Sequence, residues 1–240
     1  MPNYDTLNRF ELKYLVPAAL LPALRRELAG YTRPDANNRD ERGYPVYSVY
    51  WDSPEFTLFW EKVEGLKCRR KLRFRRYGDS PEVFVEIKQR IDRTLHKRRF
   101  RWPADCVVRT FGIADGLGWD EAAAADPVAA EVLVFCRRYR LAPRMAISYR
   151  RHAFFGVFEP ELRITFDTRV QYSATDLDIT RPFSTGKYVV DPRNAILEIK
   201  FNHRVPKWLS KLVCRHGFRA IRMSKYCSAV DREFHRGQLT

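Results

Sequence analysis

Lys71-Leu72-Arg73-Phe74-Arg75 alternates basic with apolar side chains, and this stretch is the strongest indication of the fold. A period of two is typical of a β-strand, in which successive side chains point to opposite faces of the sheet. The arrangement recurs at Arg9–Tyr14, Phe84–Lys88, Leu162–Asp167 and Ile196–Phe201. A single strand of this kind would turn its charged face to water. Several such strands in one sheet would crowd their charges together if the sheet closed into a barrel.

The overall charge indicates a polyanionic partner. The 240 residues include 44 lysines and arginines against 29 acidic residues, a formal net charge of +15. Such an excess favours binding of nucleic acid, anionic lipid, nucleotides or polyphosphate. The length suits one domain with a substantial core, and the sequence contains no linker or low-complexity segment. We therefore expect a single domain over residues 1–240.

Cysteine usage and hydropathy indicate the compartment. The five cysteines form no C-x-x-C pair, which is typical of free thiols in a reducing environment. The sequence has no signal-peptide pattern at its start, and no apolar run reaches the ~20 residues that span a bilayer. We therefore expect a cytoplasmic protein without a transmembrane segment.

Periodicity, together with proline and glycine positions, predicts an α+β protein. Helices are expected at residues 17–29, 53–63, 127–139 and 206–216, with a last helix opening near Ser224, and residues 31–43 are expected to form a polar loop. Strands are expected at residues 9–14, 44–51, 66–77, 82–90, 94–102, 144–155 and 161–169, followed by a hairpin of 187–190 and 195–201. This order favours an antiparallel sheet of about eight strands closed into a barrel. The helices would cover its apolar outer face and leave the charged face inside.

The interior of such a barrel would be strongly cationic. Like charges 4 Å apart cost about 4 kcal/mol per pair at an effective dielectric constant near 20, so the interior must bind phosphates or remain hydrated. About eight strands leave room for one slim ligand, which a triphosphate or polyphosphate chain satisfies and duplex DNA does not. We therefore expect no nucleic acid. Twelve basic residues would face four acidic ones: Arg9, Lys13, Lys71, Arg73, Arg75, Lys88, Lys97, Arg99, Arg101, Arg151, Arg163 and Lys200 against Glu11, Glu86, Asp167 and Glu198.

A series of short motifs, in order along nearly the whole chain, resembles the VTC domain, the catalytic domain of vacuolar transporter chaperone polyphosphate polymerases. That family belongs to the triphosphate tunnel metalloenzymes. One E-x-K motif alone would carry no weight, but the ordered series is specific. The matching segments are Arg9-x-Glu11-x-Lys13-Tyr14, Ser48–Pro54, Lys71-x-Arg73-x-Arg75-x-Tyr77-Gly78, Val85–Lys88, Lys97–Arg99, Tyr149-x-Arg151-x-Ala153-Phe154, Arg163-Ile164-Thr165-x-Asp167-Thr168, Leu197–Lys200 and Met223–Tyr226.

The resemblance implies an antiparallel tunnel that transfers the γ-phosphate of ATP to a growing polyphosphate chain and releases ADP. It implies a divalent ion, Mn²⁺ or Mg²⁺, and leaves open whether a membrane protein receives the product. Arginine forks suit phosphate oxygens, and carboxylates suit hard cations. The implied catalytic residues are Lys225, Arg151, Arg163 and Lys88; the implied phosphate-binding residues are Lys13, Lys71, Arg73, Arg75, Lys97, Arg99, Lys200 and Arg222; the implied metal ligands are Glu198, Glu11 and Glu86.

Two departures from the family pattern bear on the reaction. Tunnel triphosphatases usually open with E-x-E-x-K, whereas Arg9 replaces the first glutamate here, which argues against hydrolysis. Arg222 stands where a second lysine would resemble the eukaryotic polymerases more closely. Two alternatives remain open at this point: a tunnel-type inorganic triphosphatase, and a non-catalytic polyanion-binding protein, for which RNA is one conceivable ligand.

Overall fold

The computed structural model describes residues 10–38, 42–92, 94–111, 124–183 and 185–235. Its strands are β1 (Phe10–Pro17), β2 (Thr32–Pro34), β3 (Tyr44–Asp52), β4 (Cys68–Tyr77), β5 (Glu82–Ile91), β6 (Thr94–Pro103), β7 (Ala142–Gly156), β8 (Arg163–Ser173), β9 (Lys187–Tyr188) and β10 (Asn194–Phe201). Its helices are the 3₁₀ turn η1 (Ala18–Leu20), α1 (Leu21–Leu28), α2 (Thr57–Val63), α3 (Ala104–Phe111), α5 (Pro127–Tyr139), α6 (Lys207–Arg215) and α7 (Lys225–Phe234). None of the helices in the described part of the chain is long and apolar enough to cross a membrane.

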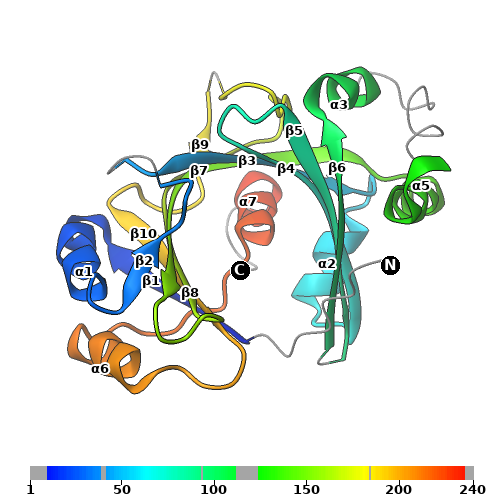
Figure 1. Ribbon diagram of the computed structural model, residues 1–240. Helices are drawn as coiled ribbons and strands as arrows, with labels where there is room; N and C mark the ends of the chain where they lie inside the picture. Colours follow the sequence, from blue (N-terminus) through cyan, green and yellow to red (C-terminus); the bar gives the residue numbers. More distant parts are fainter. Residues whose placement is uncertain (1–9, 39–41, 93, 112–123, 184, 236–240) are drawn as a thin grey trace.

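One strongly curved sheet dominates the molecule (Figure 1). Its strand order is β1-β10-β8-β7-β3-β4-β5-β6, with β2 added to β7 and β9 added to β8. Every pair in this order is antiparallel, which confirms the predicted α+β class with an antiparallel sheet. The alternating stretches of the sequence therefore lie on neighbouring strands.

The predicted closed barrel is not confirmed. Within the described residues β1 pairs with β10 and β6 pairs with β5, and no hydrogen-bonded ladder joins β1 to β6. The sheet curves around an interior; Ala220 forms an isolated bridge with Tyr14 of β1, and no described strand other than β5 pairs with β6. An alternating sequence determines which face each side chain takes, whereas closure depends on the stagger and tilt of all strands together, which the alternation does not encode.

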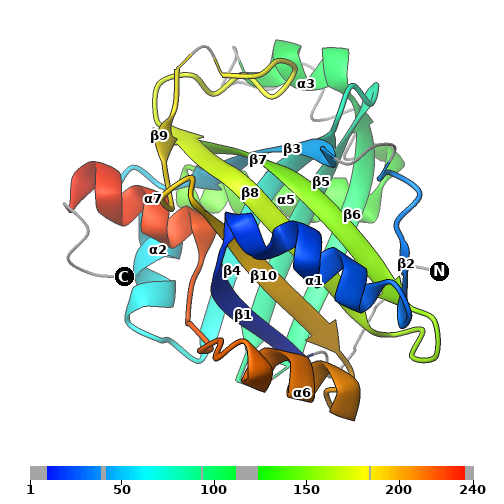
Figure 2. The same cartoon turned by 90° about the vertical axis from the view of Figure 1, so that its left-hand side faces the viewer.

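The outer face of the sheet is apolar and is covered by helices, as predicted. Leu72 and Phe74 of β4 are completely buried in a cluster with Val132 and Phe135 of α5. At the other end of the strand order, α1 and α6 pack on β1, β8 and β10 through a second cluster that includes Leu24 and Leu209. Figure 2 shows α1 and α6 lying across these strands. Because alternate residues face opposite ways, the basic neighbours of Leu72 and Phe74 face the interior.

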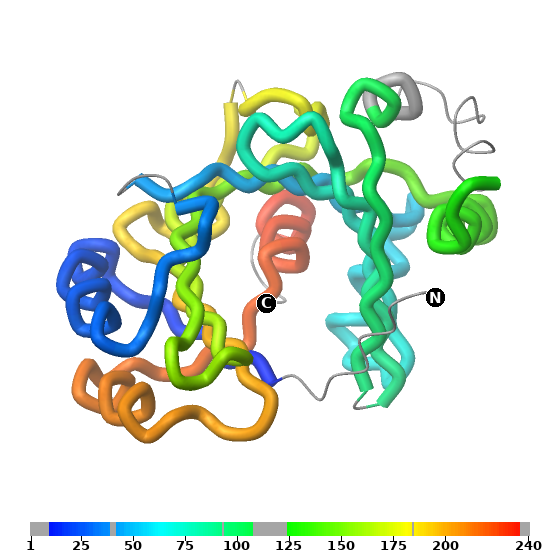
Figure 3. Tube along the Cα trace, viewed as in Figure 1, coloured from blue at the N-terminus to red at the C-terminus, as the bar shows by residue number. Residues whose placement is uncertain are grey.

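Helix α7 lies at one end of the curved sheet (Figure 2) and overlaps the interior when the molecule is viewed as in Figure 3. Its Tyr226 is buried and stacks on Tyr50 of β3, with ring centroids 4.8 Å apart. The Tyr226 hydroxyl also donates a hydrogen bond of 2.5 Å to Asp52. The second oxygen of this carboxylate accepts from the backbone N–H of Ser53 and of Leu58. Asp52 thus joins the first turn of α2 to the first turn of α7.

Four local predictions need correction. The hairpin of 187–190 with 195–201 is wrong, because β9 pairs with β8 while β10 lies between β1 and β8. The helix predicted from residue 17 begins as the 3₁₀ turn η1. The helix predicted from residue 53 begins at Thr57, because the Ser53 side chain accepts the N–H of that residue from outside the helix. The predicted loop of residues 31–43 contains the short strand β2.

Candidate functional site

The interior holds a cavity of about 280 Å³ whose walls are mainly basic. Eleven lysine and arginine side chains and three carboxylates line it. Tyr50, Tyr149 and Ser224 add hydroxyl groups. The basic residues are Lys13, Lys62, Arg69, Lys71, Arg73, Arg75, Lys88, Arg90, Arg151, Lys200 and Lys225, and the carboxylates are Glu11, Glu86 and Glu198.

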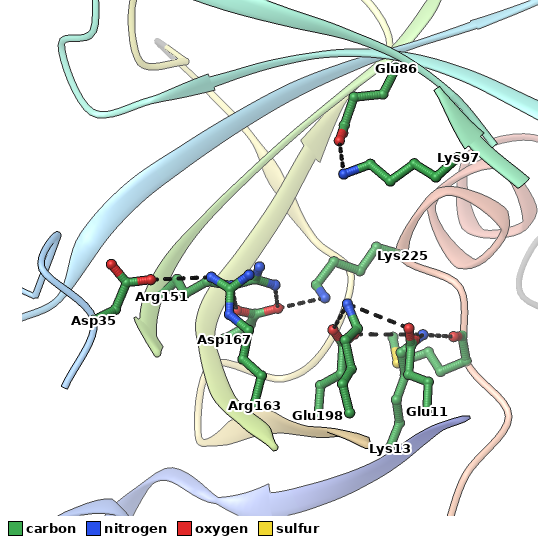
Figure 4. A network of polar contacts seen from close by, with 12 residues as sticks. Glu11, Lys13, Asp35, Glu86, Lys97, Arg151, Arg163, Asp167, Glu198 and Lys225 are labelled. Carbon is green, nitrogen blue, oxygen red and sulfur yellow. Dashed lines mark hydrogen bonds and ion pairs between the residues drawn. The ribbon is translucent and has the colours of Figure 1, made fainter. Parts of the chain in front are cut away.

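Asp167 of β8 organises one wall of this cavity. Its side chain is completely buried, and Arg151 of the neighbouring strand β7 donates two hydrogen bonds to it, of 2.7 and 2.8 Å. The Lys225 ammonium lies 2.7 Å from the Asp167 carboxylate (Figure 4). Both cations also lie over the ring of Tyr149, at 5.1 and 4.9 Å from its centroid. One carboxylate and one ring therefore fix the two cations side by side.

These contacts also fix the charge state of the group. Burial alone would raise the pKa of Asp167, but Arg151 and then Lys225 lower it from 3.8 to about 2. Burial alone would lower the pKa of Lys225, yet Asp167 raises that pKa above its ordinary value. Lys225 is therefore a protonated, positioned charge at neutral pH.

Two glutamates and two lysines form a second ion-pair group on the adjacent strands β1 and β10. Lys200 lies 2.6 Å from Glu198 and 3.5 Å from Glu11, while Lys13 lies 2.7 Å from Glu11 and 3.8 Å from Glu198. Burial opposes ionisation of both glutamates, but the lysines lower the pKa of Glu11 and hold that of Glu198 well below its usual value. We call these four residues, together with Asp167, Arg151 and Lys225, the paired cluster.

The opposite wall has cations without carboxylate partners. On β4 and β5, Arg69 is opposite Arg90 and Lys71 is opposite Lys88. Among the described residues, no carboxylate lies within 4 Å of any of these side chains or of Lys62 on α2. Burial, and next the charges of Arg73 and Lys200, lower the pKa of Lys88 well below its usual value. We call Lys62, Arg69, Lys71, Lys88 and Arg90 the unpaired cluster.

The start of α7 lies between the two clusters. Ser224 is the N-cap of this ten-residue helix, and its hydroxyl accepts from the Cys227 backbone N–H at 3.4 Å and from the Lys71 ammonium at 2.8 Å. Lys225 is the first residue of the helix, as predicted from the serine that precedes it. The positive end of the helix dipole therefore adds to the cationic character of the cavity.

Eleven of the fifteen predicted site residues line the cavity: Glu11, Lys13, Lys71, Arg73, Arg75, Glu86, Lys88, Arg151, Glu198, Lys200 and Lys225. Their chemical roles stay predictions. Lys97 lies beside the cavity, with its ammonium 2.6 Å from Glu86. Arg163 lies 3.3 Å from Asp35 in the neighbouring wall.

The structure does not bring two other predicted residues into the cavity. Arg99 is exposed and lies over the Phe84 ring, and Arg222 is exposed and lines a separate cavity with Lys187 and Arg232. Of the further predicted interior residues, Arg101 is exposed and faces Glu82, and Arg9 lies outside the described residues. On β6, which forms one edge of the open sheet, alternation alone does not place a side chain inside.

Sequence reasoning missed several lining residues. Arg69 continues the alternation of β4 by one step, and Arg90 does the same on β5, so the period of two contained the signal for both. Tyr149 has the same relation to Arg151 on β7. Lys62 lies on the helix α2, so the period of two that identifies strand residues could not predict that it lines the cavity.

The carboxylates of the paired cluster fit a metal that arrives with its substrate. Glu11 and Glu198 converge on the same two lysines, and no group of three or more metal-binding side chains occurs among the described residues. Mg²⁺ is usually held by one or two carboxylates plus substrate phosphates and not by a cage of protein ligands, so the two glutamates suit such an ion. The Glu86 carboxylate is held by Arg73 and Lys97, both at 2.6 Å, which favours a cation-positioning role for it.

Comparison with known proteins places these features in a family. Residues 8–234 match the VTC domain. The chain is 26% identical over 229 residues to vacuolar transporter chaperone complex subunit 4 of Trypanosoma cruzi (strain CL Brener), and 25% identical to that of Trypanosoma brucei brucei. The match covers 78% of this chain but only 28% of each relative, so the chain spans little more than a quarter of their length.

Solved structures share the fold at low sequence identity. A candidate adenylate cyclase from Bacillus halodurans aligns with a TM-score of 0.55 at 11% identity and covers 96% of this chain and 98% of its own. A candidate adenylyl cyclase from Hippeastrum, reported to have a dominant triphosphatase activity, aligns at 0.50 with 12% identity over 94% of each chain. The match over residues 8–234, together with the ordered motifs that form the cavity, shows that this chain belongs to the VTC domain family.

Proposed function

We propose that this protein is an ATP-dependent polyphosphate polymerase, which transfers the γ-phosphate of ATP to the end of a polyphosphate chain and releases ADP. The observation that carries the proposal is the cavity itself, in which eleven basic side chains converge with only three carboxylates. Such a charge excess needs a ligand with many negative charges in a narrow space. Membership of the VTC domain family adds support, because the ordered motifs resemble polyphosphate polymerases.

The paired cluster suits the transfer step. Phosphoryl transfer depends on positioning and on neutralising charge as the phosphoryl group moves. Arg151 and Lys225 are held side by side by Asp167, so two fixed cations would contact oxygens of the transferring group without having to reorganise. Because Lys225 stays protonated, it would act as a charge that stabilises the transition state and not as a base.

Glu198 and Glu11 would hold the divalent ion, Mn²⁺ or Mg²⁺, that accompanies the nucleotide phosphates. When bound, that ion neutralises phosphate charge beyond what the side chains supply. Lys13 and Lys200 are already paired with these glutamates, so they would turn toward phosphate oxygens as the ion takes up the carboxylates. Arg73, Arg75 and Lys88 would bind the remaining phosphates.

The test is incubation of the purified protein with ATP and Mn²⁺, followed by electrophoresis with a polyphosphate stain. A ladder of products that is lost in Lys225→Ala, with the fold intact by circular dichroism, is the expected result. Glu198→Ala should also lose the ladder. Full activity in Lys225→Ala would overturn the assignment of the site.

The same experiment separates the two alternatives. Phosphate release from tripolyphosphate without a ladder would favour a tunnel-type triphosphatase, the activity reported for the Hippeastrum protein of similar fold. Binding of tripolyphosphate without turnover would favour a non-catalytic polyanion-binding protein. Cytoplasmic localisation and a membrane partner for the product remain predictions that need experiments in cells.

A further inference from the structure

The unpaired cluster extends beyond the residues that the family resemblance assigns. Arg69, Lys71, Arg73 and Arg75 lie on one face of β4 and all line the cavity. They span residues 69–75, and the six steps between the first and the last correspond to about 20 Å at roughly 3.3 Å per residue. A triphosphate is too short to contact the whole row. The basic row therefore provides more binding surface than a nucleotide triphosphate alone can use.

The outer end of this row is a group of three cations from three elements. Arg69 is opposite Arg90 in the β4–β5 ladder, and Lys62 of α2 lines the same cavity. The next rung of the ladder, Cys68 opposite Ile91, is exposed, so this group lies where the cavity opens to solvent. We call Lys62, Arg69 and Arg90 the rim.

Backbone hydrogen bonds orient the two arginines of the rim although the rim cations repel one another. Arg69 donates to the Leu66 carbonyl oxygen at 2.8 Å and Arg90 donates to the Asp92 carbonyl oxygen at 2.9 Å, so both are oriented by backbone and not by a carboxylate. Burial and then the charge of Arg90 lower the pKa of Arg69. Burial, and then Lys71 and Arg69, lower the pKa of Lys62. A fold retains such a cluster at a cost in stability, which a bound polyanion would offset.

We propose that the rim is a second phosphate-binding subsite at the mouth of the cavity, which takes the phosphates of a linear polyphosphate beyond those held deeper in the cavity. For its ligand this inference rests on the proposed polyphosphate chemistry. The rim suits a slim chain of repeated phosphates, because its cations continue the row on β4 in the same direction. A nucleic acid strand would need aromatic surfaces for its bases, and the cavity-lining aromatic residues, Tyr50 and Tyr149, pack instead against Tyr226 and the cations of the paired cluster.

The test compares ligands of different length. Affinities for tripolyphosphate and for a longer linear polyphosphate of defined length are measured by isothermal titration calorimetry without nucleotide, in wild type and in Arg69→Gln/Arg90→Gln. The double variant should lower the ratio of long-chain to tripolyphosphate affinity by roughly two- to fivefold for each arginine removed. Arg26→Gln replaces an exposed arginine of α1 outside the cavity, removes one positive charge as each rim substitution does, and should leave the ratio unaltered.

The results of these titrations decide whether the rim binds phosphate. An unchanged ratio in the double variant, or an equal fall in Arg26→Gln, would overturn the subsite. Should the double variant not fold, Lys62→Met tests the rim from α2. An oligonucleotide that binds the rim as tightly as polyphosphate would assign it to nucleic acid instead. The measurement needs no turnover, so a reduced ratio in a protein that makes no polyphosphate would keep the subsite and reject only the proposed polymerase.

Discussion

Both walls of the cavity carry positive charge, but they differ in whether carboxylates neutralise it. In the paired cluster, Asp167, Glu11 and Glu198 neutralise the cations in contacts between 2.6 and 3.8 Å. In the unpaired cluster, the described residues provide hydroxyl and carbonyl oxygens but no carboxylate partner. The cations of the first wall have counter-charges without ligand, whereas those of the second would gain counter-charges from a bound anion. Under the proposed function, this difference would separate positioning of the reacting phosphoryl group from retention of the polyphosphate chain.

The largest expected effect follows from breaking the paired wall at its centre. Asp167→Asn should lower the free energy of unfolding by about 3–5 kcal/mol, because it removes the carboxylate that contacts both Arg151 and Lys225. Chemical denaturation measures this. Asp191→Asn, which breaks an ion pair with an arginine that is 88% exposed, is the matched control and should have a far smaller effect on the free energy of unfolding. Equal effects of the two substitutions would contradict the contrast between the walls.

The second effect is a loss of stability in acid. The folded protein lowers the pKa of Asp167 from 3.8 to about 2, so the unfolded chain binds the proton first as the pH falls. The stabilisation is therefore full above about pH 5 and is lost progressively as the pH falls to about 2, amounting to about 2–3 kcal/mol for this group. Denaturation midpoints across that range should show the loss in wild type and a smaller loss in Asp167→Asn. If wild type and Asp167→Asn lost stability equally as the pH falls, Asp167 would not be the source of the loss.

In the unpaired cluster, removing a charge should raise the free energy of unfolding instead of lowering it. Lys88→Met should stabilise the ligand-free protein by about 1 kcal/mol, because a half-buried lysine that lies among other cations and has no carboxylate partner among the described residues opposes folding. The same substitution should weaken tripolyphosphate binding about tenfold. Thermal melting with and without tripolyphosphate measures both. Lys211→Met on the exposed face of α6 should change neither, and destabilisation by Lys88→Met would argue that the wall is balanced without ligand.

The smallest effect is that of salt. Raising the ionic strength from about 0.01 to about 1 M shortens the screening length from about 30 Å to about 3 Å. The repulsion within the unpaired wall should weaken, so the ligand-free protein should gain roughly a few tenths of a kcal/mol in melting experiments. The gain should be smaller in Lys88→Met. A fall in stability with salt would mean that surface ion pairs outweigh this repulsion.

The sequence predicted which residues face the interior better than it predicted the contacts between their side chains. Alternation in β4 and β5 placed Arg73, Arg75 and Lys88 on one face correctly, because a strand has only two faces. The Asp167–Lys225 contact joins a strand to a helix end distant in sequence, and only packing of α7 against the sheet creates it. Alternation also predicted an interior position for Arg99 on the edge strand β6, and this prediction is wrong because the side chain is exposed.

In the part of the chain that the structure describes, β6 pairs on one side only, which has a consequence for how the molecule behaves in concentrated solution. An unpaired strand exposes backbone groups to which a second molecule could add its own strand, the first step of aggregation. Arg99 and Arg101 are exposed on β6, and the strand ends at Pro103, which has no N–H to donate. Charge and proline of this kind are the usual safeguards of an edge strand. Anions that neutralise these arginines would remove the safeguard. Under the proposed function, an excess of the polyanion that binds in the interior would therefore promote self-association at the edge.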